Sequence, residues 1–347
     1  PICTLHSEAG IGGSVLWRVA LPGPPNGQFT GSQTYELGAV GDDGVIVVGI
    51  ADRVFEVVPQ TNSQPVVKDL PVGYHPFAHL PGRTFCRGYG QTLMWTDGTN
   101  APVSVTLPYR DSGNLQASAV GSQGDLYTFT GDSSGFCYLT RWSRTGEQVF
   151  QRRIKDSKGI PGSLLMGIND TVFASTWDST LLAFSADGKD LWTSKTVAVP
   201  IAATSTGGLL ALDGFGRAMR ISAGGFPEAL DLVWSYSQGT LTPSDTLIDP
   251  GVFSGGLVGA LADGGTVVYS WAGGFGQLVL RLSTTGTILW QRRLTDPTAT
   301  PLIGNGAVYL LQLLDLHDGV GVRPYLTAID AGAPLVDSAW PTWMGWP

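Results

Sequence analysis

The sequence contains few charged residues and little cysteine, methionine or histidine. Only 14 % of its 347 residues are Asp, Glu, Lys or Arg, against roughly 25 % in an average soluble domain. Long surface helices require many Glu, Lys and Ala residues, so this composition argues against a helical protein. No apolar run approaches the ~18 residues that a transmembrane helix needs. The composition therefore predicts neither long surface helices nor a transmembrane segment.

Basic residues are also scarce, and they are scattered. The chain has 20 Lys and Arg residues against 28 Asp and Glu residues, a net charge of −8. The nearest thing to a basic cluster is Arg152, Arg153 and Lys155, which is echoed by Arg292 and Arg293. Binding to a polyanion depends on a basic patch or stripe that displaces counterions. Nucleic acid and anionic membrane surfaces are therefore excluded as partners.

The three cysteines form no CxxC pair, so the sequence predicts no cysteine metal site. Cys86 and Cys137 either pair in an oxidising compartment or remain as two buried free thiols. Cys3 lies close to the start of the chain, which opens at Pro1 without a methionine. We therefore expect a processed or excised chain, preceded in its precursor by a signal peptide or another domain.

Glycine and β-favouring residues are abundant, and they follow a repeat. A strand-like run, usually with a large aromatic at its centre, recurs seven times, with central positions 17, 66, 103, 150, 192, 234 and 290. The spacings range from 37 to 56 residues, close to the ~40–50 residues of a four-stranded propeller blade. Three β-rich runs, bounded by Gly, Asn or Asp, separate consecutive copies. Many of these runs are apolar on both faces, as expected for strands buried between neighbouring sheets.

The repeat count predicts an all-β fold, a seven-bladed β-propeller with four antiparallel strands per blade. The last set of three runs has no strand after it, and the strand around Trp17 has no set before it. The N-terminal strand should therefore complete the last blade, which removes the free sheet edges. An eighth blade would require a further strand at 338–343. We expect one domain over 1–347, with a leader (1–13), blades (14–335) and a C-terminal tail (336–347).

The best copies read GKDLW…VPIAATSTGGLLAL and GTILWQRRL…TPLIGNGAVYLL…LTAIDAG. This pattern resembles the PQQ-like (quinoprotein-like) repeat over nearly the whole chain, although weakly between 50 and 110. One branch of that family comprises quinone-dependent dehydrogenases, which use Ca²⁺ and often a vicinal disulfide. The other comprises non-catalytic propellers, such as the lipoprotein of the outer-membrane assembly machine. Because the chain lacks a Cys-Cys pair and long insertions, the resemblance implies the non-catalytic branch, without PQQ or another cofactor except a structural Ca²⁺.

Three motifs with catalytic or metal-binding connotations have simpler explanations. The G-x-S-x-G match at 131–135 lies between two strand-like runs, so it predicts a hairpin turn and not a nucleophile elbow. His75 and His79 would be roughly 13 Å apart in a strand, too far to share one Zn²⁺. The segment 185–188 is similar to an Asp-box but fits a turn of the repeat. The recurrent Trp17, Trp192, Trp234 and Trp290 are expected to pack between blades.

Long and aromatic loops are expected on one face of the propeller. There the predicted binding residues ring one mouth of the central channel: Trp177, Phe215, Trp271, Phe275, Asp315, His317 and Arg323. Exposed aromatics in glycine-rich loops suit a protein segment or a sugar. The sequence therefore predicts a non-catalytic, extracytoplasmic bacterial scaffold that binds a protein partner or an extended peptide. The alternative is a carbohydrate-binding or carbohydrate-active propeller, and a quinone-dependent dehydrogenase ranks below both.

Overall fold

The structure is a computed structural model, and it describes the greater part of the chain. The described residues are 13–22, 35–51, 53–61, 63–70, 75–87, 92–96, 101–107, 117–132, 134–158, 161–176, 180–195, 198–203, 207–213, 218–228, 234–237, 240–243, 257–261, 263, 266–271, 277–283, 288–294, 301–315 and 322–333. Within these ranges every regular element is a strand except one 3-10 turn, η1 (Ile168–Asp170). No helix in the described part is long and apolar enough to span a membrane.

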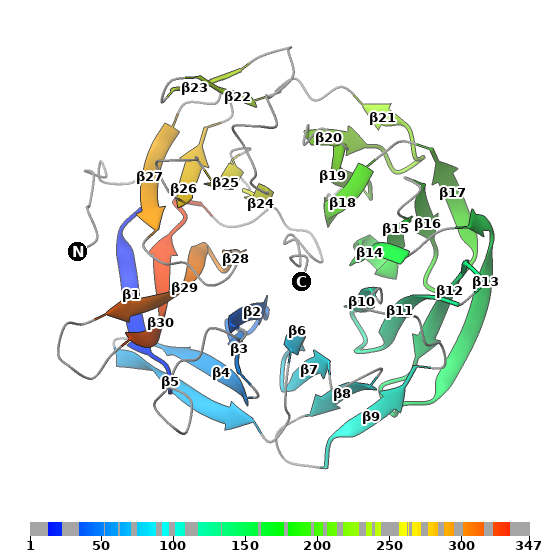
Figure 1. Cartoon of the computed structure of the whole chain (residues 1–347), viewed down its shortest axis with the longest axis horizontal. Helices are drawn as coiled ribbons and strands as arrows, with labels where there is room; N and C mark the ends of the chain where they lie inside the picture. Colours follow the sequence, from blue (N-terminus) through cyan, green and yellow to red (C-terminus); the bar gives the residue numbers. More distant parts are fainter. Residues whose placement is uncertain are drawn as a thin grey trace. The chain divides into compact units, whose positions relative to one another are not determined.

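The strands form antiparallel sheets, shown in Figure 1; seven of those in the described part have four strands and one has two. One sheet has the order β1-β30-β29-β28, made of β1 (Val15–Ala20), β28 (Leu302–Gly304), β29 (Ala307–Asp315) and β30 (Val322–Asp330). The next is β2 (Tyr35–Val40), β3 (Ile46–Ile50), β4 (Arg53–Gln60) and β5 (Ser63–Leu70). A third is β6 (His75–Leu80), β7 (Arg83–Arg87), β8 (Thr92–Thr96) and β9 (Val103–Thr106). A fourth is β24 (Leu257–Ala260), β25 (Thr266–Trp271), β26 (Gln277–Leu282) and β27 (Ile288–Leu294).

The remaining sheets come from the middle of the chain. They begin with β10 (Ala117–Val120), β11 (Leu126–Gly131), β12 (Phe136–Trp142) and β13 (Gln148–Lys158). The next is β14 (Pro161–Met166), β15 (Val172–Thr176), β16 (Leu181–Phe184) and β17 (Asp190–Ser194). The last four-stranded sheet is β18 (Ala198–Ala203), β19 (Leu209–Asp213), β20 (Ala218–Ile221) and β21 (Pro227–Glu228). The two-stranded sheet is β22 (Trp234–Ser237) and β23 (Thr240–Pro243).

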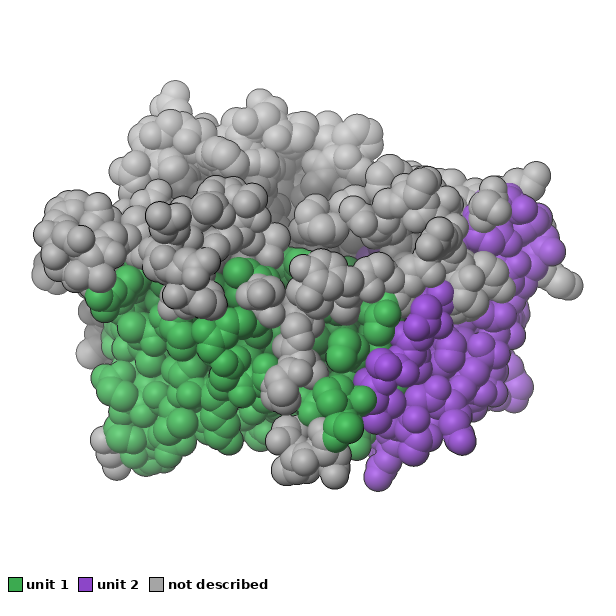
Figure 2. All heavy atoms as spheres, turned by 60° about the horizontal axis from the view of Figure 1, so that its bottom comes forward, with its two compact units in different colours: residues 1–102, 251–335, 344–347 green, residues 103–250, 336–343 purple. Residues whose placement is uncertain are grey.

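The chain divides into two compact units (Figure 2). The first comprises residues 1–102, 251–335 and 344–347, and the second comprises 103–250 and 336–343. Within the first unit the initial strands β24, β28, β2 and β6 of consecutive sheets are neighbours. Within the second unit β10, β14 and β18 are arranged in the same way. Each unit therefore stacks its sheets in sequence order through their first strands.

Two sequence predictions about these sheets are confirmed. Each set of three β-rich runs forms an antiparallel sheet with a fourth strand, as the repeat indicated. The N-terminal strand completes the last sheet, because β1 pairs with β30 from Val15 opposite Ile329 to Ala20 opposite Tyr325. Residues 338–343, where an eighth blade would need a strand, lie outside the described residues.

One predicted outer strand was wrong. The run around Trp234 is not the fourth strand of its sheet, because that place is taken by the two-residue strand β21, which pairs with β20. Trp234 instead opens β22, which pairs with β23. The cause is the turn at Ser222–Gly225, which reverses the chain directly into Phe226 and Pro227. The aromatic residue therefore comes too late in the sequence to follow that turn.

The turn between third and fourth strands has a repeated chemistry, Ser-x-x-Gly. In each of three such turns the glycine has a positive φ, at Gly146, Gly188 and Gly225, a conformation that disfavours residues with a Cβ atom. The serine hydroxyl also accepts a hydrogen bond from the backbone N–H four residues later, at distances of 3.1–3.2 Å. This local bonding satisfies a backbone N–H group within each turn, whereas the carbonyls of Gly188 and Ala223 accept hydrogen bonds from side chains of the neighbouring sheet.

Outer-strand aromatics pack on the glycine of the next sheet. A Cβ atom at Gly225 would lie 2.6 Å from the ring of Trp192, and one at Gly188 would lie 2.8 Å from that of Phe150. Trp290 covers Gly13 in the same manner, at 2.9 Å. These contacts confirm that the repeated aromatics pack between sheets. Trp17 also packs between sheets, against the hydrophobic cluster shared by β3 and β29. The side chain of Trp234 lies outside the described residues.

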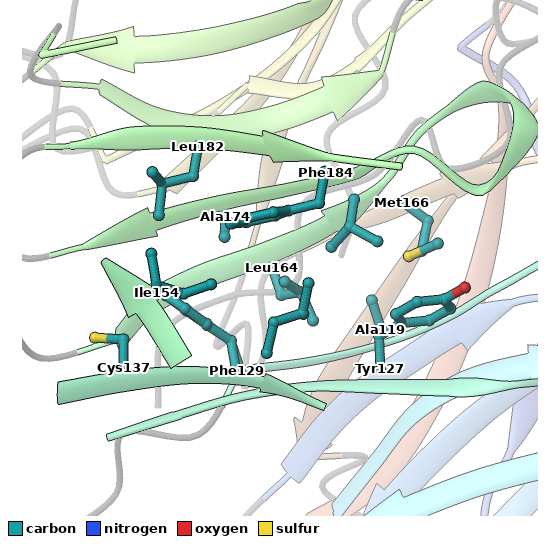
Figure 3. Close-up of a cluster of buried hydrophobic side chains, with 13 residues drawn as sticks. Ala119, Tyr127, Phe129, Cys137, Ile154, Leu164, Met166, Ala174, Leu182 and Phe184 are labelled. Carbon is teal, nitrogen blue, oxygen red and sulfur yellow. The ribbon is translucent and has the colours of Figure 1, made fainter. Parts of the chain in front are cut away.

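The core lies between neighbouring sheets, as Figure 3 shows for the sheets of β10–β13 and β14–β17. Phe129, Cys137 and Leu139 from one sheet meet Leu164 and Phe184 from the next. This packing explains why many strands are apolar on both faces, because each face of a sheet contacts a different neighbouring sheet.

Both described cysteines are buried thiols outside any disulfide, so the disulfide alternative is not realised for Cys86 and Cys137. Burial raises the pKa of the Cys86 thiol to about 12, with a smaller contribution from Glu56. A thiolate-directed reagent needs an exposed, ionised sulfur. At pH 8 we therefore expect a maleimide to leave both residues unmodified in the folded protein and to label both in urea, as measured by peptide mass spectrometry. A disulfide would instead leave both unlabelled in urea until a reductant is added.

Candidate functional site

The three predicted binding residues that the structure describes, Trp271, Asp315 and Arg323, share one end of their sheets. Trp271 is the last residue of β25 and Asp315 is the last residue of β29, both second strands of sheets in the first unit. Arg323 is half-buried and lies opposite Leu314, beside the same end of β29. We call this end, where the second strand finishes, the second-strand end. Trp177, Phe215, Phe275 and His317 lie outside the described residues.

First strands begin at the second-strand end because each sheet is antiparallel. His75 opens β6 and is paired with Arg87, the last residue of β7. Glu36, at the start of the neighbouring first strand β2, is paired with Gly49 near the end of β3. The three side chains of Glu36, His75 and Arg87 therefore meet at the second-strand end of two adjacent sheets. We call them the Glu36–His75–Arg87 cluster.

The approach of β2 to β6 depends on a glycine. A Cβ atom at Gly38 would lie 2.6 Å from the carbonyl oxygen of Pro76, closer than any two such atoms approach. Pro76 is tolerated here because the ladder between β6 and β7 has a bulge between Pro76 and Ala78. These two residues bring the first strands close enough for Glu36 and His75 to touch.

Within the cluster, the contact between His75 and Glu36 is open to solvent. His75 Nδ1 lies 2.8 Å from Glu36 Oε1, and the two side chains are 44 % and 36 % exposed. No hydrogen bond of His75 Nε2 to another described residue is present. The pair therefore offers an imidazole nitrogen to a ligand while its other nitrogen is held by a carboxylate.

Arg87 is one of two described arginines whose pKa burial lowers, and the other, Arg292, donates a hydrogen bond to the Gly13 carbonyl. The guanidinium of Arg87 lies 5.9 Å from the centroid of the buried Phe77 ring. Burial lowers the pKa of the Arg87 guanidinium, and Glu36 opposes that shift. The buried Nε has no hydrogen-bond partner among the described residues. Arg87 is thus a partly desolvated cation without a bonded counterion in the described part of the chain.

A second polar group, also in the first unit, is a buried network and not an active site. His79 Nδ1 lies 2.8 Å from Thr84 Oγ1 and His79 Nε2 lies 3.2 Å from Asp43 Oδ2. These residues have the types of a nucleophile, a base and an acid. However, Thr84 is fully buried and donates its hydroxyl proton to Glu56 at 2.7 Å. The threonine therefore cannot reach a substrate or give its proton to His79.

The histidine pair predicted not to share a metal has separate partners. His75 contacts Glu36 and His79 contacts Asp43 and Thr84. No group of three metal-ligating side chains occurs in the described part of the molecule.

The motif at 131–135 is a turn, as predicted. The Asp132 carboxylate accepts hydrogen bonds from the backbone N–H groups of Ser134 and Phe136, both at 2.9 Å, between β11 and β12. The segment 185–188 is one of the Ser-x-x-Gly turns.

The order of strands in the sequence contains a signal for the pairing of His75 with Arg87. His75 was considered only with His79, the next histidine along the strand. Once β6 and β7 are paired, the first residue of one strand must face the last residue of the other. Glu36 has no sequence signal, because its contact with His75 depends on the packing of two sheets.

Comparisons with known proteins support the fold type. No known protein family and no curated protein matches the sequence. Among solved structures, a streptogramin B lyase superposes with a TM-score of 0.59 at 14 % identity, over 93 % of this chain and 100 % of that one. Virginiamycin B lyase from Staphylococcus aureus gives 0.58 at 11 %, over 90 % and 98 %. BamB from Moraxella catarrhalis gives 0.51 at 12 %, over 91 % and 99 %. At such identities the likeness concerns the fold alone, and the chain has an all-β, propeller-type fold.

Proposed function

We propose that this chain is a non-catalytic, extracytoplasmic scaffold, a single seven-bladed propeller over 14–335 that binds an extended segment of a protein partner. The proposal places binding at the second-strand end, with Trp271, Asp315 and Arg323 and the loop residues Trp177, Phe215, Phe275 and His317. The observation that carries it is the Glu36–His75–Arg87 cluster at the same end. An exposed histidine–carboxylate contact beside a desolvated arginine offers polar anchors, and arginine is enriched in binding hot spots.

The arrangement favours binding over covalent catalysis. No nucleophile among the described residues lies beside the Glu36–His75 pair, and the one hydroxyl in a triad-like network, Thr84, is buried. The solved structures of similar fold include lyases as well as BamB, so the fold does not decide the matter. The site residues therefore carry the proposal.

The test is selection of random 12-residue peptides on phage against the purified chain. We expect enriched peptides to bind the wild type and to lose at least about tenfold in affinity on the double change Trp271→Ala and Phe275→Ala, because buried aromatic anchors dominate such interfaces. Phe226→Ala is the matched control, since Phe226 is 73 % exposed but belongs to a turn after β20. Peptides that bind the double variant as tightly as the wild type would contradict the proposed face.

A proton-transfer enzyme is the second candidate, favoured by the Glu36–His75 contact. An imidazole held by a carboxylate at one nitrogen and free at the other is suited to act as a general base. Incubation with quinupristin, which is present in a solved structure of virginiamycin B lyase, followed by mass spectrometry, separates the two candidates. Under the scaffold proposal the compound stays intact. Turnover that His75→Gln abolishes and Phe226→Ala retains would favour the enzyme.

A further inference from the structure

The state of Arg87 indicates what kind of group would be bound there. The side chain is half-buried, its Nε is enclosed without a hydrogen-bond partner in the described part of the chain, and its guanidinium faces the ring of Phe77. Burial without a bonded counterion disfavours the charged form, as the lowered pKa of Arg87 reflects. An anion that accepted hydrogen bonds from the terminal nitrogens would replace the solvation that the guanidinium has lost on burial. The guanidinium is planar and presents its donors as a fork that matches a carboxylate.

The neighbouring ion pair limits the charge that such a ligand can carry. Glu36 lies near enough to Arg87 to influence its pKa, but its Oε1 is engaged by His75 Nδ1 at 2.8 Å. A dianion such as phosphate would face repulsion from Glu36, whereas a monoanion has only one charge to place. With its Nδ1–H directed to Glu36, His75 donates from Nε2 to a carboxylate only as the imidazolium, which has an N–H group on both nitrogens. The charges of the three elements β2, β6 and β7 therefore suit a single carboxylate.

We infer that the Glu36–His75–Arg87 cluster is a carboxylate-binding site, in which Arg87 donates to a carboxylate of the bound protein segment and His75 Nε2 completes the contact. This inference rests on the proposed function, and it adds the chemical identity of the anchor. The carboxylate comes either from the C-terminus of the segment or from an aspartate or glutamate side chain. Phe77 forms the apolar floor of the site and keeps the guanidinium in place, because a cation over an aromatic face is attracted by the ring.

Selected peptides provide the first test. Each is synthesised with a free or amidated C-terminus and with its acidic side chains intact or changed to Asn and Gln. We expect one of these changes to weaken binding to the wild type by at least about tenfold, as for loss of one partner of a charged hydrogen-bonded pair. The same change should have no effect on binding to Arg87→Gln. Loss on amidation identifies the C-terminal carboxylate, and loss on Asp→Asn or Glu→Gln identifies a side chain.

Arg83→Gln is the matched control for the comparison of the wild type with Arg87→Gln. Arg83 belongs to the same strand β7 and stands at its other end, paired with Leu80. The variant should respond to amidation or amide substitution as the wild type does. If all four peptide forms bind the wild type equally, the carboxylate inference is overturned, while the scaffold proposal still stands on the selected peptides.

A second test does not depend on any peptide. The chain has four histidines, so histidine-selective ¹⁵N labelling gives few signals, and His75→Gln identifies that of His75. Titration with sodium acetate, against sodium chloride at the same ionic strength, should produce a saturable shift of the His75 ring signals. Arg87→Gln should remove the saturation and Arg83→Gln should retain it. Equal shifts with acetate and chloride would refute the site even if peptide selection succeeds.

Discussion

Replacing Gly225 with alanine is expected to lower the free energy of unfolding by about 3 kcal/mol. The residue has a φ of +83°, and an added Cβ would lie 2.6 Å from the Trp192 ring. A left-handed backbone costs a residue with a Cβ about 1–2 kcal/mol, and overpacking adds about 1–3 kcal/mol. Trp192 cannot simply move aside, because its Nε1 donates a 2.9 Å hydrogen bond to the Ala223 carbonyl in the same turn.

Gly135→Ala separates the two causes. Gly135 has a φ of +79°, and a Cβ there would meet no atom within 4 Å. It should lose only the backbone share, about 1–2 kcal/mol. Urea unfolding, followed by tryptophan fluorescence, measures both variants. Equal shifts of the urea midpoint would show that the clash with the Trp192 ring adds nothing to the cost of the Gly225 substitution.

Replacing Arg281 with leucine should destabilise the chain by about 2 kcal/mol. The side chain is 1 % exposed, forms an ion pair with Asp263, and donates a 3.1 Å hydrogen bond from Nε to the Ala331 carbonyl. It thereby joins β26 to the turn before β25 and to the sheet that contains β30. Its removal leaves Asp263 and the carbonyl of the buried Ala331 without these donors, and a buried unmatched polar group is costly.

Arg53→Leu is the matched control for Arg281. Arg53 also belongs to a third strand and also pairs with an aspartate, Asp69, but the two side chains are 32 % and 49 % exposed. Exposed ion pairs contribute less than about 1 kcal/mol, so the urea midpoint should scarcely move. A similar loss in both variants would show that burial of the guanidinium does not determine the effect.

The outer strands were predictable because they carry two signals, a central aromatic and a turn before it. Trp192 and Trp290 combine both, and their strands β17 and β27 lie where the repeat placed them. At Trp234 the two signals disagree. The Ser222–Gly225 turn ends nine residues before Trp234, the centre of that run, whereas Gly188 precedes Trp192 by four. The position of the turn determined which residues form the fourth strand, because the hydrogen bonds within the hairpin form regardless of which aromatic residue follows.

A repeat of arginines was present in the sequence but not used. Arg141 and Arg281 each stand two residues before the serine of a Ser-x-x-Gly turn. In the structure each pairs with an aspartate near the start of its sheet's second strand, Asp125 and Asp263 respectively. The basic residues Arg152 and Arg292 also have structural partners, the carbonyl oxygens of Gly188 and Gly13. Charges that follow a repeat register are therefore better explained by contacts between sheets than by a polyanionic partner.

The shared end of the candidate residues was predictable as a location but not as a set of contacts. Strand order alone places Trp271, Asp315 and Arg323 at the second-strand end, because consecutive antiparallel strands alternate in direction. The Glu36–His75 contact joins residues from different sheets, and its formation depends on the missing Cβ of Gly38. No periodicity within one strand contains that information.

The pairing of β1 with β30 has a consequence for how the chain folds. Val15 and Ile329 are partners in one ladder, so the chain between them forms a loop of roughly 300 residues, whose closure costs entropy that short hairpins avoid. During synthesis β1 emerges long before β30 and remains unpaired until β30 has been made. The other sheets can form from local hairpins in the meantime. This sheet should therefore be the slowest to assemble, and its unpaired strands are the part of the nascent chain most exposed to aggregation.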